Sequence, residues 1–254
     1  MRRIFVPLLL LAFLPTFLPA QTPAQTTAPR GPDGRTVNLV PGVDVLPLPG
    51  APFSAISTIT WTRQAAEGAS VVTYGIAKVS RDSQGRVYRE RHHFSPNPNV
   101  DPRTTLFEFS VRDPLAHTFT HCIRVEHTCT IQNFRSQTAV PALQPVGPFD
   151  GGKRYLTRES LGNQTIEELA AVGTMETVTI AVGTIGNDRP LKSTREFWYS
   201  PDLQTNLKVT RIDPREGTQD VRLTAVSRTE PDPGVFAIPT GYTVRDLHSS
   251  SDIK

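Results

Sequence analysis

The sequence contains few cysteines and few methionines. Its 254 residues include only 2 Cys and 2 Met, and 37% of them are hydrophobic. Two Cys exclude a disulfide-dense miniprotein, and a single long apolar run excludes a polytopic membrane protein. The 23 Pro are too many for a helical bundle, because proline interrupts helices. This composition favours a β-rich fold with a flexible segment.

Known catalytic signatures are also missing from the chain. There is no G-x-S-x-G and no H-E-x-x-H, and the six His do not fall beside a nucleophile motif. Glu167 and Glu168 are neighbours, so in a strand their carboxylates point to opposite faces. Gly183 to Gly186 is followed by no helical pattern and so does not resemble a phosphate-binding loop. The sequence therefore predicts no catalytic residue, no cofactor, no metal site and no enzymatic activity.

The start of the chain carries the pattern of a secretory signal peptide. Arg2 and Arg3 precede an apolar stretch from Ile4 to Phe17, and Leu18-Pro19-Ala20 follows as a small-residue cleavage site. The alternative, a retained membrane anchor, is disfavoured because three prolines interrupt a run shorter than a membrane span requires. We predict removal of residues 1–20, no integral membrane span after processing, and a periplasmic or secreted location.

The charge of the processed chain excludes one class of partner. Removing residues 1–20 takes away two Arg and no acid, which lowers the net charge from +3 to +1. Binding to the phosphate backbone of nucleic acids requires a concentrated basic face. A nearly neutral chain with scattered Arg therefore predicts no nucleic-acid partner.

The composition divides the processed chain into three parts. Residues 21–52 hold repeated Pro and Gly and predict a flexible arm. Residues 53–246 carry short stretches rich in Thr, Val, Ile and aromatic residues, with polar turns about every ten residues, which predicts a single antiparallel β domain. Within it, the Pro/Gly-rich residues 139–153 predict a long connection. Residues 247–254 predict a flexible tail.

Turn motifs give the clearest periodic signal. Asp or Ser at the first turn position, Pro at the second and Gly later are typical of β-turns. They predict four hairpins, at Arg81–Arg86, Arg112–Pro114, Ser200–Asp202 and Asp213–Gly217. Thr165 with Glu168 resembles a helix cap, but the segment is short, so we predict a turn entering a strand, with one helical turn as the alternative.

Three stretches alternate apolar and polar residues, and each predicts a strand with one apolar face. An aromatic-rich strand is predicted at Phe197–Tyr199. The three apolar sets are Phe107, Phe109 and Val111; Val178, Ile180 and Val182; and Val221, Leu223 and Ala225.

The two cysteines predict a disulfide. If the chain turns at Val125 and Glu126, Cys122 and Cys129 face each other across an antiparallel pair, and an exported protein meets an oxidising compartment. Free thiols remain one alternative. A zinc site with His121 and His127 is another, although adjacent strand residues such as His121 and Cys122 point to opposite faces.

Several stretches resemble a group of uncharacterised bacterial secreted proteins. They are Pro52–Ala55, Arg81–Arg86, Leu161–Ile166, Ile185–Pro190, Trp198–Leu203 and Glu230–Pro239. The strand pattern and the ending Phe236–Tyr242 show a looser similarity to periplasmic lipoprotein-carrier and lipoprotein-sorting proteins. That similarity implies a curved antiparallel meander forming a half-open barrel around an apolar cavity. The sequence itself predicts few or no long helices.

Two functions follow from this resemblance and from the apolar strand faces. The first is a non-catalytic extracytoplasmic protein that binds a hydrophobic ligand, such as an acyl chain or a lipoprotein, on the curved sheet. The alternative is a periplasmic interaction or sensor module whose strand edges bind another envelope protein. The residues expected to line the ligand site are Phe107, Phe109, Val178, Ile180, Val221, Leu223 and Ala225.

Overall fold

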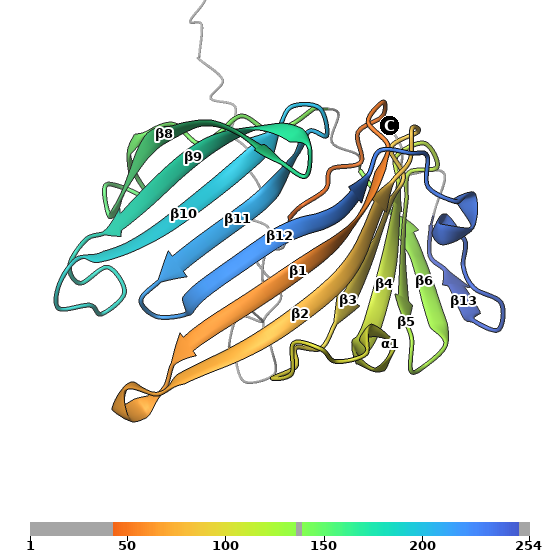
Figure 1. Ribbon diagram of the computed structural model, residues 1–254, viewed down its shortest axis with the longest axis horizontal. Helices are drawn as coiled ribbons and strands as arrows, with labels where there is room; N and C mark the ends of the chain where they lie inside the picture. The colour runs from red at the N-terminus through yellow and green to blue at the C-terminus, as the bar shows by residue number, and fades with distance from the viewer. Residues whose placement is uncertain (1–42, 136–138, 249–254) are drawn as a thin grey trace, which may run out of the picture. The chain divides into compact units, whose positions relative to one another are not determined.

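The computed structural model describes residues 43–135 and 139–248, and this part of the chain is mainly β structure (Figure 1). The predicted signal peptide and most of the predicted arm and tail lie outside the described residues. The helical elements of the described residues are short: η1 (Ala66–Gly68), α1 (Pro102–Thr105) and η2 (Pro233–Phe236). The strands are β1 (Phe53–Gln64), β2 (Ser70–Arg81), β3 (Val87–His92), β4 (Leu106–Asp113), β5 (Thr118–Ile123), β6 (Thr128–Asn133), β7 (Gly147–Phe149), β8 (Arg154–Ile166), β9 (Leu169–Ile180), β10 (Leu191–Ser200), β11 (Thr205–Asp213), β12 (Gly217–Ser227) and β13 (Thr243–Asp246).

The thirteen strands of the described residues form one sheet, in the order β13-β6-β5-β4-β3-β2-β1-β12-β11-β10-β9-β8-β7. Neighbouring strands are antiparallel, except that β13 pairs with β6 in parallel. The sheet is curved, and its end strands β7 and β13 do not pair with each other (Figure 1). The structure therefore confirms the prediction of a curved antiparallel sheet that is not closed into a barrel. It also confirms the prediction of few or no long helices.

All four predicted hairpin turns are present. They connect β2 to β3, β4 to β5, β10 to β11 and β11 to β12. The hairpin of β8 and β9 turns at Glu167 and Glu168, whose φ angles of 50° and 62° are both positive. A two-residue turn of this kind follows the twist of the strands, although it usually contains Asn or Gly. The segment is thus a turn between strands, as predicted, and not a helix.

The alternation of side chains gives the sheet two faces, and directly paired residues of neighbouring strands share a face. We call one the Arg81 face. It carries Phe53 of β1, Val79 of β2 and Leu223 of β12. We call the other the Phe109 face, and it carries Cys122 of β5 and Tyr88 of β3.

Residues 43–51 pack on the Arg81 face. Val43 and Val45 are buried in the same cluster as Phe53, and Leu48 is buried as well. Arg112 on β4 also donates a hydrogen bond of 2.9 Å to the carbonyl oxygen of Val45. The last residues of the predicted flexible arm are therefore packed, because the aliphatic side chains among its prolines cover the sheet.

Arg81 fixes this segment to the sheet. Its side chain is fully buried, and burial lowers the pKa of its guanidinium to about 10. The guanidinium donates to the carbonyl oxygens of Leu46 at 3.1 Å, Ala51 at 3.0 and 2.8 Å, and Leu203 at 2.6 Å. These bonds join residues 46–51, the end of β2 and the turn between β10 and β11.

The Phe109 face has its own small core around the disulfide. Cys122 and Cys129 are directly paired residues of β5 and β6 and form the predicted bond, with both side chains buried. Phe109 packs on them, and Tyr242 from the C-terminal segment contacts the Phe109 ring at 5.8 Å between centroids. The disulfide uses both thiols that the zinc alternative required.

We expect Arg81→Met to destabilise the protein by more than about 3 kcal/mol, because it removes four charge-assisted hydrogen bonds. The carbonyl oxygens of Ala51 and Leu203 then lose their donor, whereas that of Leu46 still accepts from the N–H of Leu48. Arg228→Met is the matched control, because Arg228 is exposed and lies 3.8 Å from Asp202. Urea unfolding measures both variants. Equal free energies of unfolding for the two variants would show that Arg81 has no structural role.

We expect the disulfide to contribute about 2 to 3 kcal/mol, as the loop-entropy model gives for so short a loop. Unfolding with and without a reductant should show this loss for the natural chain. The double variant Cys122→Ala, Cys129→Ala should not respond to the reductant, and a natural chain that is equally insensitive would contradict the expectation.

Candidate ligand-binding groove

The residues predicted to line one ligand site lie on both faces of the sheet. The register places Val221 and Leu223 on the same face as Ser110 of β4, so the adjacent Phe109 points to the opposite face. The apolar sets therefore do not converge, because the number of residues in each intervening hairpin decides which face a strand presents. Val178, Ile180, Val221 and Leu223 belong to the Arg81 face, and Phe107 and Phe109 belong to the Phe109 face.

Two members of the predicted sets leave the alternating pattern. Ala225 is exposed, with a φ of 50°, where the pairing of β1 with β12 shifts register. This bulge interrupts the alternation that would have placed Ala225 beside Leu223. Val182 is exposed in the loop after β9. Neither residue continues the apolar face that the sequence predicted.

Two adjoining hollows on the Arg81 face of β9 to β12 form what we call the groove. Their volumes are about 400 Å³ and about 540 Å³. They share Asp44, Arg195 and Asn206, so they adjoin along β10 and β11. Of the residues predicted to bind a ligand, Val178 and Val221 line this groove.

The larger hollow is mainly apolar. Phe197 and Tyr199 of β10 and Val172 of β9 form its floor. Residues of two other segments also line it: Leu46 from the packed N-terminal segment, and Leu143 with its neighbours from the connection before β7. Val172 and Leu143 are exposed. Exposed apolar side chains gathered around a hollow are typical of a binding surface.

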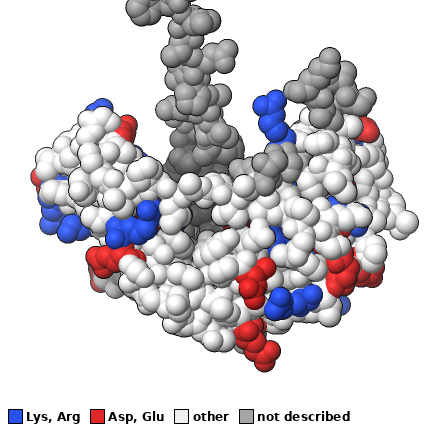
Figure 2. All heavy atoms as spheres, turned by 90° about the horizontal axis from the view of Figure 1, so that it is seen from above, with Lys and Arg blue, Asp and Glu red and all other residues white. Residues whose placement is uncertain are grey.

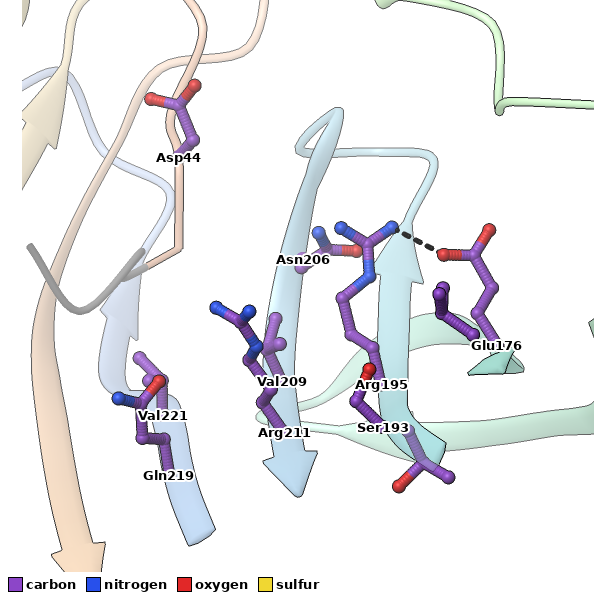
Figure 3. Close-up of a pocket in the computed structure, with 11 residues that line it drawn as sticks. Asp44, Glu176, Ser193, Arg195, Asn206, Val209, Arg211, Gln219 and Val221 are labelled. Carbon is purple, nitrogen blue, oxygen red and sulfur yellow. Dashed lines mark ion pairs between the residues drawn. The ribbon is translucent and has the colours of Figure 1, made fainter. Parts of the chain in front are cut away.

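A polar row of five residues runs across the sheet, and four of them, all but Arg158, line the smaller hollow (Figure 3). Each residue of the row is the direct cross-strand partner of the next, so all five lie on the Arg81 face. The row contains three cations and one anion. From β12 to β8 it consists of Gln219, Arg211, Arg195, Glu176 and Arg158.

Glu176 neutralises only part of this charge. Its carboxylate accepts a hydrogen bond from Arg158 at 2.6 Å and forms an ion pair with Arg195 at 3.0 Å. The Arg195 guanidinium also lies 4.7 Å from the centroid of the Phe197 ring, and so borders the apolar hollow. Arg211 has no ion pair among the described residues. The row thus carries more positive than negative charge, and its Arg211 lies in the groove beside the apolar hollow.

Two polar atoms of the groove have no hydrogen-bond partner among the described residues. They are Nε2 of Gln219, a residue only 3% exposed, and Oδ1 of Asn206. A buried polar group without a partner costs about 1 to 3 kcal/mol. Both residues line the smaller hollow, so a bound ligand or water would remove this cost.

Sequence reasoning did not identify Arg211, Gln219 or Asn206. The only indication in the sequence was spacing. Arg211 is two residues from Val209, and Gln219 is two residues from Val221, so each polar residue shares a strand face with an apolar one. Nothing local indicates which polar residues of a strand meet those of its neighbours. That information comes from the strand register.

Phe109 borders a separate hollow of about 360 Å³ on the other face. It lies between β2, β3 and β4 and the C-terminal segment, with Tyr88 and Tyr242 in its lining. The Tyr88 hydroxyl donates to Glu90 at 3.0 Å, so this hollow already has an internal polar pair.

Other kinds of site have little support in the described residues. They contain no group of three His, Cys, Asp or Glu side chains suited to a metal ion, and none of their helices is long and apolar enough to cross a membrane. Figure 2 shows basic and acidic side chains interspersed on the face in view.

No family profile and no curated protein sequence matches the chain. Among solved structures, it is similar to an uncharacterized conserved protein from Thermus thermophilus, with 13% identity, 77% of this chain and 90% of that chain covered, and a TM-score of 0.40. It is also similar to a chain of the Pseudomonas aeruginosa MucA/MucB complex, with 14% identity, coverage of 72% and 55%, and a TM-score of 0.35. A domain from Vibrio parahaemolyticus described as an outer membrane lipoprotein-sorting protein has 9% identity, coverage of 73% and 89%, and a TM-score of 0.29. All three are likenesses of structure at 9 to 14% sequence identity.

We expect Leu223→Ala to destabilise the protein by about 2 to 5 kcal/mol, because Leu223 is 1% exposed and belongs to the core cluster. Ile212→Ala on the neighbouring strand should cost far less, because Ile212 is 50% exposed. Chemical denaturation compares them. A small effect for Leu223→Ala would mean that this residue lines an open site.

Proposed function

We propose that this protein is a non-catalytic extracytoplasmic protein that binds a hydrophobic ligand, such as an acyl chain, in the groove on the Arg81 face. The observation that carries the proposal is the apolar hollow of about 540 Å³, which continues into the polar row. Its volume falls in the range of small-molecule sites, which are mostly apolar with a few polar groups that orient the ligand. Export through residues 1–20 is part of the proposal.

The hydrophobic effect provides the driving force. Each buried methylene contributes about 0.8 kcal/mol, so eight methylenes of an acyl chain contribute roughly 6 kcal/mol before the costs of association. The ligand would cover Phe197, Val172 and Leu143, of which Val172 and Leu143 are exposed to water in the described residues. The polar row would hold the more hydrophilic end of such a ligand.

One observation favours the second candidate, an interaction module. β7 pairs with β8 only at Arg154–Leu156, so the outer edge of β8 from Thr157 to Ile166 has no strand partner among the described residues. Such an edge can accept an added strand from a partner protein. This function needs no ligand in the groove, and so the two candidates make different predictions for the groove.

We expect delipidated full-length protein to bind the neutral apolar probe N-phenyl-1-naphthylamine with a saturable rise in fluorescence. Thr174→Trp should weaken this binding about tenfold or more, because Thr174 lines the apolar hollow and a Trp there would fill it. Thr177→Trp is the matched control, because it makes the same change on the opposite face of β9.

Thermal unfolding of both variants establishes that they are folded. Absence of probe binding by the natural chain, or equal binding by the two Trp variants, would rule out the groove as the ligand site. In that case capture of an extended peptide along β8 would favour the interaction module.

A further inference from the structure

The polar row of the groove is built with an excess of positive charge. Like charges directly opposite each other on neighbouring strands destabilise a sheet, and Arg195 and Arg211 are such a pair. Glu176 is within ion-pair distance of Arg195 and Arg158, and no side chain of the row compensates Arg211. A partner for Arg211 must therefore come from outside the row.

Two other carboxylates, Asp44 and Asp213, are each engaged by another arginine. Asp44 lines the groove but pairs with Arg112 at 3.3 Å. Asp213, two residues after Arg211 on β11, is held by Arg215 at 2.7 Å. Neither carboxylate lies within ion-pair distance of Arg211 in the described residues. The guanidinium of Arg211 is therefore available to an anion in the groove.

Gln219 supplies a second, independent donor. It is the direct cross-strand partner of Arg211, it lines the groove, and its buried Nε2 has no partner among the described residues. The guanidinium nitrogens of Arg211 and Nε2 of Gln219 are hydrogen-bond donors. They can therefore bind an oxyanion, whereas they offer no acceptor to a cation. Figure 3 places Gln219, Arg211 and Arg195 side by side across the hollow.

We propose that Arg211 and Gln219 form a subsite for the acidic head group, a carboxylate or a phosphate, of the ligand whose chain occupies the apolar hollow. This inference rests on the proposed function and adds the chemical class of the ligand. The anion would separate the charges of Arg211 and Arg195 and satisfy the Gln219 amide. An acidic amphiphile would then bind more tightly than a neutral one of equal chain length.

Isothermal titration of the delipidated full-length protein with three twelve-carbon probes tests this inference. Dodecanoate and dodecyl phosphate should each bind about tenfold or more tightly than 1-dodecanol, and the stronger of the two identifies the oxyanion. Arg211→Gln should remove most of this preference without changing the affinity for dodecanol. Gln219→Met, similar in size but without the amide, should lower the affinity for the acids several-fold.

Arg222→Gln is the control for charge alone, because Arg222 lies on the opposite face of β12 and pairs with Asp220. It should leave the preference intact. If dodecanol binds as tightly as the acids, or if Arg222→Gln acts like Arg211→Gln, the head-group subsite is wrong while the apolar site stands. If none of the three probes binds, the subsite and the proposed function both fail.

Discussion

The guanidinium of Arg81 is fully buried, and four hydrogen bonds to the carbonyl oxygens of Leu46, Ala51 and Leu203 hold it there. Burying a charge costs free energy unless hydrogen bonds compensate it. Arg81 therefore fixes the positions of the three carbonyl groups that accept its hydrogen bonds. Residues 43–51 are thereby fixed across the sheet. Asp44 and Leu46, which line the groove, take their positions from this attachment.

The groove combines two environments that a flat sheet face would not bring together. Residues 43–51 and the connection before β7 line the apolar hollow together with Phe197 and Tyr199. The polar row crosses the same face of the sheet at Arg195, two residues before Phe197 on β10. Arg195 belongs to both, since it contacts Glu176 and the Phe197 ring. An apolar floor ending at a cationic row suits an amphiphile, because the two parts of such a ligand need opposite surroundings.

Strand register decides which side chains can act together. Phe107 and Phe109 share one strand face, and so do Val221 and Leu223, yet these two pairs lie on opposite sides of one sheet. A shift of one residue in pairing exchanges the two faces of a strand. The bulge at Ala225 shows the same effect locally, because it removes that residue from the face that Leu223 occupies.

The sequence by itself determined the antiparallel strands and the hairpin turns such as Arg81–Arg86, and it favoured the pairing of Cys122 with Cys129 that the structure contains. These follow from local chemistry, since turn residues and side-chain alternation act over a few positions. Only the tertiary structure decided that residues 43–51 pack on the sheet and that Arg211 and Gln219 meet in the groove. Those features depend on contacts between segments far apart in the chain, for which no local pattern exists.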